Sequence, residues 1–192
     1  MSDIDDSEMN LSGKLLIAMP GMGDPRFEKS VVFMCAHSPE GAMGLIVNKP
    51  SEDLSLGDVL SQLEIDASSI TKAGKIFFGG PVEGGRGFVL HSGEYDNDDS
   101  TLKVDDAFSM TATRDILEAI AHGEGPEEAL AALGYAGWSP GQIEDEIQQN
   151  AWLTCDAEKA IVFAADDKSK WTAALAKLGI DPLLLSAEGG SA

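Results

Sequence analysis

The sequence is poor in basic residues and has no long apolar run, and each shortage excludes a class of partner. Lys and Arg number 13 against 33 Asp and Glu, so the formal net charge at pH 7 is −20. Because proteins bind polyanions by neutralising their phosphates, we expect no direct nucleic-acid partner. No apolar run is long enough to cross a bilayer, and the chain does not start with a basic segment followed by an apolar one. We therefore expect a cytoplasmic protein with no membrane partner.

Cysteine and histidine are also scarce. The two cysteines, Cys35 and Cys155, are too few for a disulfide framework and lie in no Cys-x-x-Cys or Cys/His metal spacing. We expect both to be reduced and mostly buried. Glu144, Asp145 and Glu146 would be the material of a metal site, but without histidine spacing or a calcium-loop pattern we interpret them as solvated surface. The sequence therefore predicts no metal and no cofactor.

The composition favours one domain between two short tails. A chain of 192 residues with 43% hydrophobic residues is long enough for one well-cored domain. Residues 1–10 hold four carboxylates and no basic side chain, which is typical of a disordered, solvated tail. We assign residues 11–186 to a single domain and residues 187–192 to a flexible C-terminal tail.

Hydrophobic periodicity predicts a mixed α+β fold. Short apolar runs predict strands at 14–19, 30–36, 44–48, 75–78, 88–91 and 160–163. Helices are predicted after a capping box of Ser55 and Asp58, after Thr113 up to Gly123, at 127–133, and after the N-cap Ser139 with a returning Gln142. A last helix is predicted from about 168 to Gly179, with Trp171, Leu175 and Leu178 buried. Strands would then dominate the first half and helices the second, which indicates a mixed sheet.

The glycine-rich stretch FFGGPVEGGRGFVLHS, residues 77–92, raises the question of a phosphate cradle. Gly80 and Gly85 have the glycine spacing of a P-loop, but Arg86 and Gly87 stand where lysine and a hydroxyl residue are required. No register fits the dinucleotide fingerprint, and the apolar run that follows predicts a strand instead of a helix. We therefore interpret the glycines as turn geometry.

Four segments carry a resemblance to a known family. They are MPGMGDPRFEKSVVFMCAH at 19–37, GAMGLIVNKP at 41–50, the glycine-rich stretch, and GYAGWSPGQIEDEIQQNAWL at 134–153. With them the chain resembles the AlgH/YqgE family of bacterial proteins. The resemblance implies a small closed β-barrel with a bifurcated sheet surrounded by helices. The family name comes from a proposed role in regulating alginate synthesis, but the sequence has no helix-turn-helix and no basic recognition helix. A regulatory role would have to act through a protein partner or a ligand.

Arg86 and His91 are the candidate ligand-binding residues of the glycine-rich stretch. Arg86 would bind a carboxylate or phosphate with its planar guanidinium, or pair internally with Glu83, Glu144 or another carboxylate. Because the chain has many carboxylates, we favour the internal partner. His91 ends the predicted strand after the glycines, near the point where Arg86 must emerge.

Asp24 and Asn48 are two further ligand-binding candidates. Asp24 would hold a carboxylate at the rim of a cleft, or cap a helix that begins with Pro25, and we favour the cap. Asn48 would hydrogen-bond a ligand or organise the turn before Pro50.

Cys35 and His37 form the candidate reactive-thiol pair. At i and i+2 of a strand they share one face, but about 7 Å separates them along the backbone, which is long for a direct hydrogen bond. We therefore expect Cys35 to be a buried, slow thiol.

The aromatic residues Tyr135, Trp138 and Trp152 flank the helix predicted after Ser139. They would form a hydrophobic contact surface or complete a core. Because aromatic side chains beside helix ends usually complete a core, we expect the core role.

Two functions remain open at the level of the sequence. The first is a non-enzymatic regulatory or adaptor protein that binds a protein partner or a small anionic ligand at the glycine-rich face. The alternative is an enzyme, either thiol-dependent through Cys35 and His37 or a hydrolase built on Asp24, Arg86 and His91. Convergence of these residues in one pocket would favour the enzyme or a ligand site.

Overall fold

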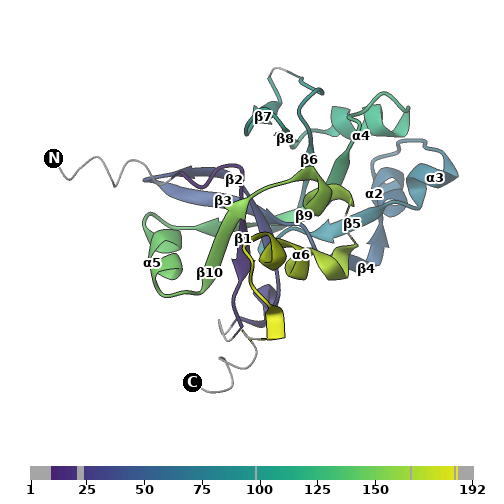
Figure 1. Cartoon of the computed structure of the whole chain (residues 1–192). Helices are drawn as coiled ribbons and strands as arrows, with labels where there is room; N and C mark the ends of the chain where they lie inside the picture. Colours follow the sequence, from purple (N-terminus) through teal and green to yellow (C-terminus); the bar gives the residue numbers. More distant parts are fainter. Residues whose placement is uncertain (1–9, 21–23, 98, 165, 184, 186–192) are drawn as a thin grey trace.

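The computed structural model describes residues 10–20, 24–97, 99–164, 166–183 and 185. The predicted tails, apart from Asn10, lie outside the described residues. A strongly curled sheet forms the centre of the molecule, with helices on several sides of it (Figure 1). Within the described residues, no helix has both the length and the apolar character needed to cross a membrane.

Ten strands make up the sheet, and it forks at one of them. The strands are β1 Lys14–Ala18, β2 Val31–Ser38, β3 Gly41–Ile46, β4 Pro50–Ser55, β5 Lys75–Phe78, β6 Val82–Ser92, β7 Thr101–Lys103, β8 Phe108–Thr111, β9 Ala129–Trp138 and β10 Trp152–Asp156. They run in the order β10-β1-β2-β3-β9-β6-β8-β7, with every neighbouring pair antiparallel. A side branch leaves β9 through the parallel strand β5, which pairs with β4. The predicted α+β class with a bifurcated mixed sheet is confirmed, and the curl has the form of an antiparallel half-barrel.

The fork lies at Gly134, in the middle of β9. Residues 131–133 of β9 pair with β5, and residues 136–138 pair with β3. Gly134 between them has a φ of +77°, a left-handed conformation that favours glycine. Gly79 joins the branches, because its N–H donates to Leu133 O at 2.9 Å and its carbonyl accepts from Ile46 N at 2.9 Å.

The helices are short and cover separate parts of the sheet (Figure 1). They are the 3₁₀ turns η1 Pro25–Phe27 and η3 Asp167–Ser169, the π turn η2 Ala160–Ala164, and the α-helices α2 Leu56–Gln62, α3 Ser69–Lys72, α4 Arg114–Ala121, α5 Gln142–Gln148 and α6 Lys170–Lys177. The predicted capping box is confirmed, since Asp58 N donates to Ser55 Oγ and Ser55 N donates to Asp58 Oδ2. Gly123 and Gly179, both with positive φ, follow α4 and α6 as predicted.

Three predictions from periodicity are wrong. Residues 127–133, predicted as a helix, belong largely to β9, because strands on both of its edges outweigh the helix propensity of Ala and Leu. Residues 160–163, predicted as a strand, form the π turn η2. The predicted division into a strand-rich first half and a helical second half fails because β7 to β10 all lie in the second half.

The start of α5 and the core face of α6 differ slightly from prediction. Gly141, with a φ of +78°, is the N-cap of α5 in place of Ser139, although Ser139 N does donate to Gln142 Oε1 at 3.0 Å. In α6, Trp171 and Leu175 are buried as predicted, whereas Leu178, which follows the helix, is exposed.

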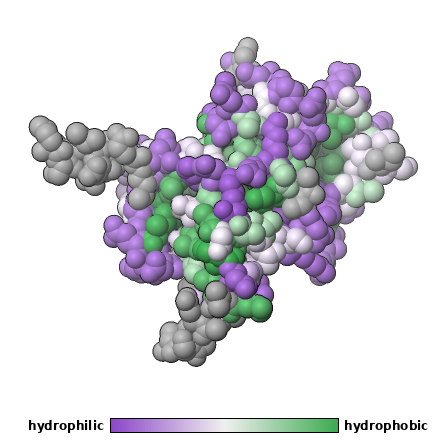
Figure 2. All heavy atoms as spheres, viewed as in Figure 1, coloured by the Kyte–Doolittle hydropathy of each residue, from purple (hydrophilic) through white to green (hydrophobic). Residues whose placement is uncertain are grey.

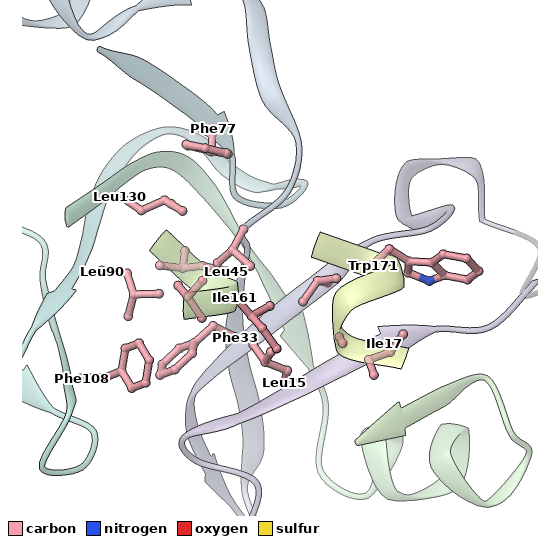
Figure 3. Packing of buried hydrophobic residues seen from close by; sticks show 14 of the residues in the cluster. Leu15, Ile17, Phe33, Leu45, Phe77, Leu90, Phe108, Leu130, Ile161 and Trp171 are labelled. Atoms are coloured by element: carbon pink, nitrogen blue, oxygen red, sulfur yellow. The ribbon is translucent and has the colours of Figure 1, made fainter. Parts of the chain in front are cut away.

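The core consists of separate hydrophobic clusters on the two faces of the sheet. Alternate residues of β1 and β2 enter different clusters, with Leu15 and Phe33 in one and Leu16 and Val32 in the other. The first cluster lies between the curled sheet and α6 (Figure 3). On the face shown in Figure 2, hydrophilic side chains cover most of the surface and hydrophobic ones gather near the middle, around α6. Because β1 and β2 are buried on both faces, they are continuous apolar runs in the sequence.

Candidate functional site: the cleft at the sheet fork

A cleft of about 730 Å³ lies beside the fork, which we call the fork cleft. Its walls are the end of β2, the start of β3, the start of β6, the end of β8 and the second half of β9. The largest apolar side chains of its lining are Met43, Phe88, Met110, Tyr135 and Trp138. The polar side chains of its lining are His37, Ser38, Glu40, Glu83, Arg86 and Ser139. The cleft has the size and mixed lining of a small-molecule site.

The glycine-rich stretch shapes one wall of the cleft. Val82 pairs with Tyr135 and the next pair is Gly87 with Leu133, so residues 83–86 bulge out of the ladder. At Gly80, where φ is +155°, an added Cβ would lie 2.0 Å from the carbonyl carbon of Tyr135. At Gly85 an added Cβ would meet no atom within 4 Å. Gly80 therefore permits close contact with β9, whereas Gly85 belongs to an open bulge.

Arg86 projects from this bulge with only a weak internal partner. Its side chain is 54% exposed, and its Nη1 lies 3.9 Å from Oε2 of Glu83, which is itself 52% exposed. The guanidinium carbon lies 5.3 Å from the centre of the Phe88 ring. Glu144, the other internal partner considered, pairs with His37 instead. Since an exposed pair at this distance contributes little, the guanidinium keeps donors available for an anion in the cleft.

His37 is fixed in the wall of the cleft by two hydrogen bonds. Its Nδ1 accepts from the backbone N–H of Leu11 at 3.0 Å, and its Nε2 lies 3.0 Å from Oε2 of Glu144. Because Nδ1 is an acceptor, Nε2 carries the hydrogen and donates to the carboxylate. Both ring nitrogens are occupied, so His37 ties β2 to α5 and has no nitrogen left to act as a base.

Cys35 does not share a face with His37, so the predicted same-face pair is wrong. The register between β2 and β3 shifts between Met34 and Ala36, which makes Cys35 an extra residue in a β-bulge. Cys35 packs in the first hydrophobic cluster, whereas His37 bonds to Leu11 of the second. Burial raises the pKa of the Cys35 thiol to about 12. The expectation of a buried thiol is therefore confirmed, and both cysteines are free and buried.

His91 lies near the end of β6, beyond Arg86, and does not line the fork cleft. It is fully buried, with Nδ1 donating to Ser92 O at 2.9 Å and Nε2 lying 2.8 Å from Oγ1 of Thr111. Burial lowers its pKa, and the bond to Ser92 O and the charges of Glu94 and Asp96 oppose this shift. The prediction that His91 lies near Arg86 is wrong, because the five residue steps from Arg86 to His91 span about 17 Å of extended strand.

Asp24 and Asn48 organise local structure outside the fork cleft. The predicted cap is confirmed: Asp24 accepts from Arg26 N at 3.0 Å and pairs with the Arg26 side chain at 2.8 Å, and these bonds lower its pKa. Asn48 accepts from Val31 N and donates to Lys29 O, both at 2.9 Å, so it clamps the chain before β2. Asp24, Arg86 and His91 therefore do not converge.

Glu144 and Glu146 of α5 are engaged in hydrogen bonds, so their interpretation as solvated surface is wrong, whereas Asp145 is exposed as expected. Oε1 of Glu146 accepts from the indole N–H groups of Trp138 at 3.0 Å and Trp152 at 2.9 Å, and Oε2 accepts from Gln142 at 2.9 Å. Glu144 receives the bond from His37. Two tryptophans with buried rings need acceptors for their N–H groups, and that need is a sequence signal that predicts a nearby hydrogen-bond acceptor.

Comparisons with known proteins identify relatives of the chain in sequence and in fold. A family model described as AlgH-like matches residues 15–183. A UPF0301 protein of Ruegeria pomeroyi is 60% identical over 185 residues, covering 96% of this chain and all of the relative, and one of Paracoccus denitrificans is 53% identical over 189 residues, covering 97% of this chain and all of the relative. The solution structure of the AlgH protein from Pseudomonas aeruginosa superposes with a TM-score of 0.79 at 45% identity, covering 94% of this chain and 95% of that one. A crystal structure from Corynebacterium diphtheriae, 20% identical, shares the fold with a TM-score of 0.70, covering 90% of this chain and 88% of that one.

Proposed function

The chain belongs to the AlgH-like family, and from the geometry of the fork cleft we propose that it is a non-enzymatic binding protein for a small anionic ligand. The observation that carries the proposal is Arg86, a half-exposed guanidinium that stands over the Phe88 ring at the mouth of a large cleft. A cation placed by an aromatic ring and only weakly paired is well suited to recognise a carboxylate.

The lining of the cleft narrows the class of ligand. Met43, Met110 and Tyr135 offer apolar surface for the body of a ligand, and the Ser38 and Ser139 hydroxyls offer hydrogen bonds. Glu40 and Glu83 lie in the same lining and repel multiply charged anions. The proposed ligand is therefore a monocarboxylate with an apolar or aromatic body.

The positions of the reactive side chains favour binding over catalysis. The Cys35 thiol has its pKa raised by burial and has no histidine beside it, while both nitrogens of His37 are engaged. A nucleophile and its base normally lie within hydrogen-bond reach. The chain's other reactive candidates, Asp24 and His91, lie outside the fork cleft.

A regulatory or adaptor role follows because the proposed ligand would bind beside the exposed bulge of residues 83–86. Residues 83–86 are exposed and free of ladder pairing, so a ligand that ordered Arg86 would alter the surface shown to a protein partner. Under this proposal the ligand binds first, and the protein partner then recognises the surface of residues 83–86.

Thermal shift on the whole chain tests the proposal. The panel contains benzoate, phenylacetate and hexanoate, with inorganic phosphate as a multiply charged comparison. A ligand that binds only the native state raises the melting temperature in proportion to RT ln(1 + [L]/Kd). We expect at least one monocarboxylate to raise the melting temperature of the wild type, and Arg86→Lys to lose most of that rise because lysine lacks the planar fork.

Arg26→Lys is the matched control, since Arg26 is also a half-exposed arginine paired with a carboxylate, and it lies outside the cleft. The control should respond like the wild type. An equal loss of the shift in Arg26→Lys and Arg86→Lys, or no shift with any member of the panel, would contradict the proposed function.

A further inference from the structure

A second hollow, on another part of the molecule, is lined by several lysine side chains, although the chain has few basic residues. It has a volume of about 430 Å³ and lies between the segment before β2, the turn between β3 and β4, and the start of α6. We call it the lysine hollow and define it by six of its lining residues: Glu28, Lys29, Asn48, Lys49, Lys168 and Trp171. Three of the ten lysines of the sequence therefore line one small hollow of a protein with a net charge of −20.

The lysine hollow is built by defined contacts. Lys29 has a φ of +54°, a conformation that is uncommon for a side-chain-bearing residue. Its carbonyl accepts from the Asn48 side chain, whose oxygen accepts from Val31 N, so Asn48 holds the backbone of Lys29 in this conformation. The Lys29 ammonium then lies 5.6 Å from the centre of the Trp171 ring. The Trp171 ring is fixed in turn, because its Nε1 donates to Ala18 O at 2.9 Å.

Lys49 is positioned by a neutral acceptor, which leaves its charge uncompensated. Its Nζ donates to the backbone carbonyl of Glu28 at 2.8 Å, and an ammonium has two more donors. Among the described residues, no carboxylate lies within ion-pair distance of Lys29, Lys49 or Lys168. The Glu28 side chain is the one carboxylate of the hollow that is not engaged by a lysine.

Asp167 also lines the hollow, but lysines on its far side neutralise it. Its Oδ1 lies 2.9 Å from Nζ of Lys170, and its Oδ2 lies 2.6 Å from Nζ of Lys75. The Lys170 side chain is buried and also donates to Val47 O at 2.8 Å. The local balance therefore favours an anion: the hollow is lined by three lysines that have no carboxylate partner among the described residues and by one carboxylate, Glu28, that no lysine engages, while Asp167 is shared by two further lysines.

We propose that the lysine hollow is a second anion-binding site, specific for the phosphate group of a small phosphorylated metabolite. A phosphate dianion accepts hydrogen bonds from several ammonium groups at once, which a single carboxylate does less well. The Trp171 ring and the stems of the lysines provide apolar surface beside the charges for the rest of the metabolite. The site is separate from the fork cleft, which is lined by other residues and takes a different class of anion.

NMR titration of the ¹⁵N-labelled full chain tests this site, with inorganic phosphate and glycerol 3-phosphate as probes and chloride used to keep the ionic strength constant. We expect saturable shifts at the backbone amides of Lys29 and Lys168, the side-chain amide of Asn48 and the indole N–H of Trp171. Glycerol 3-phosphate should produce the same pattern as inorganic phosphate, because the phosphate group carries the recognition.

Two double variants distinguish phosphate binding in the lysine hollow from a general effect of the protein's net charge. Lys49→Gln with Lys168→Gln removes two cations from the hollow, whereas Lys72→Gln with Lys103→Gln removes two exposed lysines outside it. The first should weaken phosphate binding by about tenfold or more, and the second should leave it within about twofold. Lys72, Lys103 and Lys168 are exposed and Lys49 is half-buried, and the Trp171 indole resonance reports that each variant is folded.

Shifts that do not saturate, an equal loss of affinity in both double variants, or shifts that cluster away from Lys29 and Trp171 would each overturn the proposal. The fork cleft is tested with monocarboxylates and Arg86, so failure of one site is distinguishable from failure of the other.

Discussion

The two halves of β6 differ in every respect that matters for function. Residues 83–87 are exposed and glycine-rich, and residues 83–86 bulge from the ladder with Arg86 loosely paired. Residues 88–92 are buried and fully paired with neighbouring strands, and both ring nitrogens of His91 have partners. Five positions separate a side chain that is free to bind from one that is committed to the fold.

The comparison shows that a reactive residue type is weak evidence for a site. Histidine is the commoner catalytic residue, yet His91 is a buried structural side chain, and Arg86 is the residue open to the cleft. What distinguishes them is the number of internal partners that each side chain has. The predictions below test this contrast between committed and available side chains.

The largest expected effect concerns Cys35, which packs with Leu90 of the buried half in the first hydrophobic cluster. Since burial raises its pKa to about 12, thiolate is scarce at neutral pH and the sulfur is inaccessible. Alkylation by iodoacetamide near neutral pH should be slower than that of an exposed thiol by about a hundredfold or more. Mass spectrometry of Cys35 over time measures the rate of alkylation. Fast alkylation that is lost in His37→Ala would contradict the purely structural role of Cys35.

A large loss of stability is expected for Gly80→Ala, at the entry to β6. The new Cβ would lie 2.0 Å from a backbone atom of Tyr135, so β9 or the loop must move. We expect the free energy of unfolding to fall by about 3 kcal/mol or more, and that of Gly85→Ala to stay within about 0.5 kcal/mol of the wild type. Urea denaturation of both variants checks the difference. Similar losses at the two glycines would show that the bulge is as tightly packed as the entry.

Replacement of His91 by Ala should cost about 2–3 kcal/mol of unfolding free energy, because Thr111 loses a buried partner and a cavity remains. The same denaturation experiment measures it. A cost below about 0.5 kcal/mol would mean that the buried half of β6 tolerates the loss of its polar bonds.

The pH dependence of stability should also depend on His91. Burial lowers its folded-state pKa below 6.5, so the unfolded state binds more protons as the pH falls below 6.5. Stability contributed by neutral His91 is therefore complete above 6.5 and is lost as pH falls toward the folded-state pKa. Wild type should show this decline and His91→Gln should lack it, while Arg86→Met should retain it. A decline of equal size in His91→Gln would assign the dependence to other groups.

The smallest effect is expected for Arg86→Met. Its pair with Glu83 is long and both side chains are half-exposed, so its loss should change the unfolding free energy by no more than about 0.5 kcal/mol. A destabilisation above about 1 kcal/mol would indicate that Arg86 is committed to the fold like His91.

The sequence predicted those features that local chemistry determines. The capping box of Ser55 and Asp58 and the cap by Asp24 depend on residues within three positions of each other, and both are present. The apolar runs of β1 and β2 are recognisable because both faces of these strands are buried.

The features that the sequence did not predict depend on pairing between segments that are distant in the chain. β9 is rich in Ala and Leu, and it is a strand because β3, β5 and β6, which come at least 37 residues earlier, hydrogen-bond to its edges. The bulge at Cys35 arises from the register with β3 and has no glycine or turn residue to mark it. Tyr135, for which we favoured a core role over a contact surface, lines the cleft because the fork opens beside it. Arg86 could be identified as a candidate because glycines surround it, but its freedom from strong partners could not.

The contrast along β6 is tested most directly by ¹⁵N NMR titration of the full chain with the monocarboxylate that gives the largest thermal shift, benzoate being the first. We predict saturable shifts at the Arg86 Nε–H, the amides of residues 83–87 and the amide of Tyr135, with His91 and Ser92 unchanged. Shifts that are largest at His91, or that spread equally over both halves of β6, would contradict the account.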